Sequence, residues 1–292
     1  MSPAAPVVGS ANRREPARRA GSRRSAKNST RRSAPALIAA PALIALVFLV
    51  LPLLALLIRA PWTRLGELLS ASEVLSALRL SLICATIATI LALIIGVPLA
   101  WMLARVRFPG SSVVRALVTL PLVLPPVVGG IALLLALGRV GVVGQYLNSW
   151  FGITLPFTSV AVVLAETFVA MPFLVVTVEG ALRAADSDVE EAAVTLGASR
   201  MTVFWRVTLP AVGPSLVAGA ILCWARALGE FGATITFAGN FPGTTQTMPL
   251  KIYAAFQLDP DAAIALGLVL LSVAVIVLGL LRDRWLRGPV SL

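Results

Sequence analysis

Six long apolar segments dominate the hydrophobic pattern of this chain, and short polar stretches separate them. Each segment is long enough to cross the hydrocarbon core of a membrane, which takes about 20 helical residues. Together they predict an all-α, polytopic membrane protein, with one transmembrane domain over 36–287. The predicted spans are 36–58, 75–104, 113–137, 157–181, 212–238 and 262–281.

The polar loop at 182–211, between the fourth and fifth segments, carries signals for two short helices. Ser187 and Glu190 fit a capping box, in which each side chain bonds the other residue's backbone amide. Gly197 is placed to end the first helix in the left-handed conformation, and Ser199 can cap a second one. A helix of about nine residues is not stable alone in water, so we expect it to dock on another protein.

Prolines interrupt several predicted spans and leave backbone groups without partners. Such groups are tolerated at membrane depth only where protein or a water-filled cavity satisfies them. Helices broken beside a translocation path and ordinary kinks for helix packing are both open interpretations. The prolines are Pro98, Pro121, Pro125, Pro126 and Pro172.

The distribution of basic residues predicts the orientation. The segments 1–35, 105–115, 181–211 and 282–287 hold 18 of the 24 Lys and Arg, the opposite side holds four, and two lie within spans. Loops rich in Lys and Arg stay in the cytoplasm. Both termini and the 182–211 loop are therefore predicted to be cytoplasmic.

Residues 1–35 carry nine Lys or Arg against one acidic residue and are predicted to form a disordered cytoplasmic tail. Such a tail can bind nucleic acid or anionic lipid. Because a span follows at once, we favour a role in membrane orientation and expect no nucleic-acid partner.

The sequence lacks the groups that most enzymes use. It has no histidine, and its two cysteines are too far apart in sequence to indicate a metal site. Neither lysine, Lys27 or Lys251, lies in the Gly-x-x-x-x-Gly-Lys-Ser/Thr pattern that cradles nucleotide phosphates. We expect no catalytic residue, cofactor or metal site. An enzyme relying on isolated carboxylates such as Glu166 and Glu230 is a weaker alternative.

The 182–211 loop resembles the Glu-Ala-Ala loop of ABC-importer permeases. That motif continues with a glycine four residues after the second alanine, nine further residues, an aliphatic residue, any residue and Leu-Pro. The resemblance implies a type I ABC-importer transmembrane domain, in which coupling helices at 187–210 receive the motion of a separate ATPase. The residues that it assigns to this contact are Glu190, Glu191, Ala192, Ala193, Gly197, Leu209 and Pro210.

The stretches 225–237 and 242–253 resemble molybdate permeases, while sulfate and thiosulfate permeases share only the Gly-Glu-aromatic-Gly core. This resemblance implies import of molybdate or tungstate by alternating access, with sulfate or thiosulfate as the alternative. It implies a permease homodimer in the bacterial cytoplasmic membrane, a homodimeric cytoplasmic ATPase that holds ATP and Mg²⁺, and an extracytoplasmic molybdate-binding protein. A stand-alone channel or carrier would have no use for the coupling loop.

Two charged residues in the fifth segment, Arg226 and Glu230, are four positions apart, so they can pair on one helix face. The pair either braces the helix bundle or belongs to a gate. Gly229, Gly232 and Thr234, beside it, are further candidates for the translocation path or gate.

Three other charged residues fall in or near the spans. Glu166 in the fourth segment has no neighbour of opposite charge in sequence, and Arg79 in the second is its candidate partner. Glu179 lies near the cytoplasmic end of the fourth segment, where we expect it to reach water.

Overall fold

The computed structural model describes residues 36–286, and in that range every regular element is a helix. The all-α prediction is therefore confirmed. The predicted basic tail at 1–35 lies outside the described residues. The chain divides into two compact units at Leu51 and Pro52, within α1 (Ala36–Ile58), and the second unit holds everything that follows.

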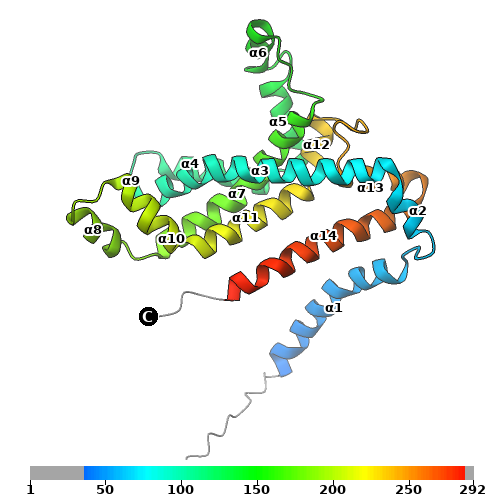
Figure 1. Cartoon of the computed structure of the whole chain (residues 1–292), viewed down its shortest axis with the longest axis horizontal. Coiled ribbons are helices and arrows are strands. Elements are labelled where there is room, and N and C mark those ends of the chain that lie inside the picture. Colours follow the sequence, from blue (N-terminus) through cyan, green and yellow to red (C-terminus); the bar gives the residue numbers. More distant parts are fainter. Residues whose placement is uncertain (1–35, 287–292) are drawn as a thin grey trace, which may run out of the picture. The chain divides into compact units, whose positions relative to one another are not determined.

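Thirteen α-helices and one π-helix follow α1 among the described residues (Figure 1). In chain order they are α2 (Leu65–Ser70), α3 (Ser72–Arg105), α4 (Ser111–Val123), α5 (Pro126–Leu137), α6 (Gly144–Phe151), α7 (Ser159–Ala184), α8 (Asp188–Thr195), α9 (Arg200–Val203), η1 (Phe204–Thr208), α10 (Leu209–Ala211), α11 (Gly213–Leu228), α12 (Gly232–Phe237), α13 (Met248–Leu258) and α14 (Pro260–Leu286).

Four described helices are long and apolar enough to cross a membrane, and the number rises to six if each of two bent pairs is one span. One bent pair joins α4 to α5, and the other joins the 200–211 segment to α11. The four long stretches are Ala39–Ile58, Ser72–Arg105, Ser159–Ala184 and Pro260–Val277.

Helices α3, α7 and α11 pack together as the core of the second unit. Small residues let them approach closely, as is usual between membrane helices. Ala88 and Ala92 of α3 and Ala165 of α7 are fully buried. A Cβ atom on Gly96 of α3 would lie 3.2 Å from the Val175 side chain of α7. This core fixes the end of α3 relative to the end of α7, where the polar loop begins.

The proline cluster breaks the third predicted span. Helix α4 ends at Val123, α5 begins at Pro126, and the two are bent by 120°. Proline fixes its own backbone and removes the residue before it from the helical region, so Leu124 and Pro125 are extended. Elsewhere, Pro98 and Pro172 lie inside continuous helices.

The sequence predicts one span over 212–238, but the structure has two helices there, α11 and α12. The Glu230 carboxylate accepts a hydrogen bond from the Ala233 amide at 2.7 Å, which favours the start of a new helix. Gly232 at that start lies against α5, because a Cβ atom on it would be 2.8 Å from Cβ of Pro126. The two interrupted segments of the chain therefore meet each other.

Candidate functional site

The polar loop between α7 and α11 forms the two helices that its sequence predicts. Helix α8 ends before Gly197, which has a φ of 89°. In that left-handed region glycine avoids the strain that other residues would meet. The Ser199 hydroxyl accepts a hydrogen bond from the Thr202 amide at 3.2 Å, so the predicted cap of the second helix is confirmed.

The predicted capping box at the start of α8 is wrong. The Ser187 side chain makes no capping hydrogen bond, and the Asp188 amide donates instead to the Asp186 carboxylate at 3.0 Å. Glu190 points to Arg105 at the end of α3, at 2.9 Å. A hydrogen bond from a guanidinium to a carboxylate is stronger than one from a neutral amide. This explains why the Glu190 carboxylate bonds Arg105 and not the Ser187 amide.

The Arg105–Glu190 ion pair ties α8 to the transmembrane helices. The two side chains are only 16% and 18% exposed. Arg105 also donates to the Ala185 carbonyl, just before the loop, at 3.5 Å. Among the described residues no other side-chain hydrogen bond joins α8 to a transmembrane helix. A cavity of about 720 Å³ lies between α8 and the end of α3, so direct packing there is limited.

The outer surface of α8 is open to a partner. Glu191, Ala192 and Gly197 are exposed, and no residue of α8 is fully buried. Leu196, which directly follows the helix, is 89% exposed. Apolar and acidic groups on a two-turn helix that is not packed on its own chain are typical of a docking surface.

The second part of the loop is anchored by aromatic packing. Phe204 lies edge-on to Trp101 of α3, with ring centroids 6.0 Å apart. The Leu209 amide reaches back to the Phe204 carbonyl, one residue further than in an α-helix. Pro210 follows at once and has no amide to continue the ordinary pattern. Leu209 is half-buried, whereas Pro210 is exposed.

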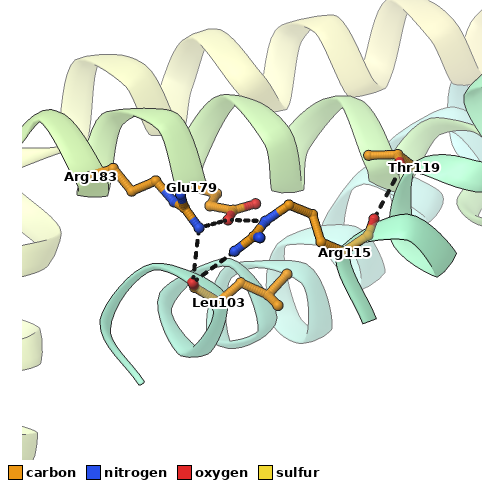
Figure 2. Close-up of polar contacts among 5 residues, drawn as sticks. All are labelled: Leu103, Arg115, Thr119, Glu179 and Arg183. Atoms are coloured by element: carbon orange, nitrogen blue, oxygen red, sulfur yellow. Dashed lines mark hydrogen bonds and ion pairs between the residues drawn. The ribbon is translucent and has the colours of Figure 1, made fainter. Parts of the chain in front are cut away.

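A second polar cluster joins the ends of α3, α4 and α7 on the same side as the loop (Figure 2). The Glu179 carboxylate accepts from Arg115 and from Arg183, each at 2.8 Å. Both arginines also donate to the Leu103 carbonyl, each at 3.4 Å. The prediction that Glu179 reaches water is wrong, because the two arginines enclose its side chain and leave 8% exposed.

The sequence signal for this cluster was incomplete. Glu179 and Arg183 are four residues apart on α7, a spacing that does predict pairing. Arg115 lies 64 residues away from Glu179, so only the fold brings it to the same carboxylate.

The predicted Arg226–Glu230 pair forms, with an N–O distance of 2.5 Å. Glu230 is 1% exposed. Its other carboxylate oxygen accepts the hydrogen bond from the Ala233 amide at the start of α12. Gly229 ends α11 and Gly232 begins α12, so both lie at the break between them. Thr234 is fully buried on α12. The structure thus brings these five residues together around one helix break.

The candidate pair between Arg79 and Glu166 does not form. Glu166 is buried in α7, and one of its carboxylate oxygens has no hydrogen-bond partner. Arg79 instead lines a groove on the exposed face of α3. The two side chains lie on different faces of the helix packing, which charge complementarity alone could not reveal.

Comparison with known proteins identifies the family. Residues 96–288 match the family described as "Binding-protein-dependent transport system inner membrane component". The chain belongs to this family. The prediction of an ABC-importer permease, a multi-pass transport component of the inner membrane, is confirmed.

Individual relatives agree with this assignment. This permease is 51% identical to the "Molybdenum transport system permease protein ModB" of Mycobacterium tuberculosis, covering 81% of this chain and 89% of that protein. It is 36% identical to the "Sulfate transport system permease protein CysT" of Salmonella typhimurium, covering 80% and 85%. A crystal structure of a bacterial ABC transporter that imports alginate shares the fold, with a TM-score of 0.70 at 20% identity over 87% of this permease and 95% of that chain.

Proposed function

We propose that this permease carries molybdate, and tungstate with it, into the cell as part of an ATP-driven importer. The support is the greater identity to the molybdenum permease than to the sulfate permease, at similar coverage. Import of sulfate or thiosulfate is the second candidate, because a sulfate permease is also a relative, 36% identical over 80% of this chain.

The proposed assembly has two copies of the permease, a homodimeric cytoplasmic ATPase that binds ATP and Mg²⁺, and an extracytoplasmic binding protein that delivers the anion. Both termini of the permease are cytoplasmic in this proposal. The excess of Lys and Arg at the loop end of α3 and α7 supports this orientation.

In this proposal the ATPase docks on α8. Its exposed surface, with Glu191, Ala192 and Gly197, receives the ATPase, and the half-buried Ala193 lets the helix lie close to α9. The Arg105–Glu190 pair then passes any displacement of α8 to the end of α3.

From the end of α3 a continuous set of contacts leads into the membrane. The Glu179 cluster joins α3 and α7 to α4. Helix α4 leads through the 120° break to α5, and α5 packs on α12 beside the Arg226–Glu230 pair. We assign Arg226, Gly229, Glu230, Gly232 and Thr234 to the gate because they surround the break at which these two interrupted segments meet.

The test is ATP hydrolysis by the reconstituted complex with its binding protein, supplied with either molybdate or sulfate. Stimulation by molybdate supports the proposed cargo. Stimulation by sulfate alone would contradict it and favour the second candidate.

The docking surface has a separate test. Glu191→Lys and Gly197→Asp should abolish association with the ATPase while the permease still inserts in the membrane. Glu67→Lys is the matched control, because Glu67 is also exposed but lies on α2, before the start of α3. Unchanged ATPase association in both loop variants would contradict docking at α8.

A further inference from the structure

Arg79 is a charged residue inside a transmembrane helix that has no partner among the described residues. It makes no ion pair and no side-chain hydrogen bond there, whereas Arg226, on α11, is paired with Glu230. Its side chain is exposed on α3, seven residues from the start of that helix. A charge within a membrane segment is costly, and such residues usually mark a path or a site.

Arg79 lines a groove of about 510 Å³ whose polar groups carry positive charge or hydroxyls. Ser72, Ser76 and Arg79 lie on one face of α3, at the spacing that aligns residues along a helix. No carboxylate lines the groove, and Glu73, the acidic residue nearest in sequence, is paired with Lys251. The groove is therefore electropositive.

The groove is open and roomy. Its wall across from α3 includes Gly243, in the loop before α13, which has a φ of 76° and open space where a Cβ atom would lie. A groove of this size is much larger than one water needs, so it has room for an anion that keeps part of its hydration.

The groove lies at the end of α3 that is far from the coupling loop. Arg79 and Arg105 are 26 residues apart on one helix, which corresponds to about 39 Å. Arg105 holds α8. If α8 docks on a cytoplasmic ATPase, the groove opens to the extracytoplasmic side, where a binding protein releases its cargo.

We propose that this groove, built on Arg79 with Ser72 and Ser76, is an entry site for a free tetrahedral oxyanion. The planar guanidinium forms paired hydrogen bonds to two oxygens of such an anion, and the Ser72 hydroxyl donates to a third. The Ser76 hydroxyl donates to the Glu73 carbonyl at 2.9 Å in this structure and has to turn to reach the anion. Because the site is open and holds a single positive charge, it binds the anion loosely enough to release it inward. The proposal rests on the function proposed above, since it takes the cargo to be such an anion.

The first experiment measures anion uptake by the full complex in proteoliposomes, with its ATPase and binding protein. Arg79→Gln should lower uptake at limiting cargo on the order of tenfold, the usual cost of losing a hydrogen bond to a charged group. Arg79→Lys keeps the charge but loses the paired hydrogen bonds, so its uptake should lie between those of Arg79→Gln and the unaltered complex. Arg59→Gln is the matched control, because Arg59 is an exposed arginine on the same side of the membrane and outside the groove. It should transport like the unaltered complex.

The second experiment measures binding of molybdate alone to the purified permease–ATPase complex, by titration calorimetry without the binding protein. We expect a weak isotherm that Arg79→Gln weakens about tenfold and Arg59→Gln leaves unchanged. Equal uptake and equal binding in the Arg79→Gln and Arg59→Gln complexes would overturn the site.

Two further outcomes separate the possible sources of the anion. If purified unaltered complex retains lipid phosphorus that Arg79→Gln loses, while molybdate uptake is equal in both, a lipid headgroup fills the groove and the proposal is overturned. If the unaltered complex transports sulfate but not molybdate, only the proposed cargo fails. An Arg79→Gln defect in sulfate uptake then still supports the site, and its absence overturns it.

Discussion

The Arg105–Glu190 pair should determine how much transport each ATP produces. Both side chains are mostly buried, so solvent screens this pair less than a typical surface pair, which contributes about 0.2–1 kcal/mol. A hydrogen bond to a charged group contributes about 1.5–3 kcal/mol. We take the lower end, about 1.5 kcal/mol, because each side chain keeps some exposure.

Glu190→Ala removes the carboxylate. The ratio of α8 bound to the end of α3 to α8 detached from it should therefore fall about tenfold, since 1.4 kcal/mol corresponds to a factor of ten. Glu190→Gln keeps an oxygen acceptor and loses only the charge, so its effect should be intermediate. The ATPase can still dock on Glu191 and its exposed neighbours, but the motion that it imparts reaches α3 less often.

The assay is the number of molybdate ions imported per ATP hydrolysed in proteoliposomes. The ratio should fall severalfold for Glu190→Ala and recover when Arg105→Glu is combined with Glu190→Arg. Val189→Ala controls for changes in α8 itself, because Val189 is exposed on the same helix. An unchanged ratio in both Glu190→Ala and Arg105→Ala would refute the reasoning.

Three further predictions concern the stability of the permease in detergent, measured as its melting temperature in thermal unfolding. Gly130→Ala should destabilise the permease by about 1–3 kcal/mol, because its Cβ atom would lie 2.7 Å from a carbonyl of α12 and against a threonine hydroxyl; Gly180→Ala, with nothing within 4 Å, should be neutral or stabilising. Glu179→Gln should destabilise by about 1–3 kcal/mol, since it leaves two arginines facing each other, and a melting temperature equal to that of the unaltered protein would contradict the cluster. The hydrogen bond from the Ala262 amide, together with Arg64, lowers the pKa of Asp259. Ionised Asp259 therefore stabilises the fold above its unfolded pKa of about 3.9. This stabilisation is lost as the pH falls through the lower pKa of the folded state. The melting temperature of Asp259→Asn should be below that of the unaltered protein at pH 7 and approach it toward pH 3; a difference that does not change with pH would contradict this.

Much of the fold follows from local sequence. Apolar length predicts where spans lie, and Gly197 and Ser199 mark the helix boundaries in the loop because their conformations depend on neighbouring residues. The Arg226–Glu230 pair is also local, since four residues on a helix place two side chains together.

The parts that sequence did not reveal depend on distant partners. Glu190 and Arg105 are 85 positions apart, and their attraction overrides a capping box that local rules favour. The groove around Arg79 needs Gly243 from a loop that follows α12. The close packing of Gly232 on Pro126 at the break after α11 joins segments far apart in sequence, which no local rule contains.

The most direct test of the proposed function is accumulation of labelled molybdate inside proteoliposomes that hold the permease and its ATPase. With the binding protein outside and ATP inside, molybdate should accumulate above its external concentration, and Glu191→Lys should prevent this. Failure of the unaltered complex to accumulate molybdate while it accumulates sulfate, or accumulation without ATP, would contradict ATP-driven molybdate import.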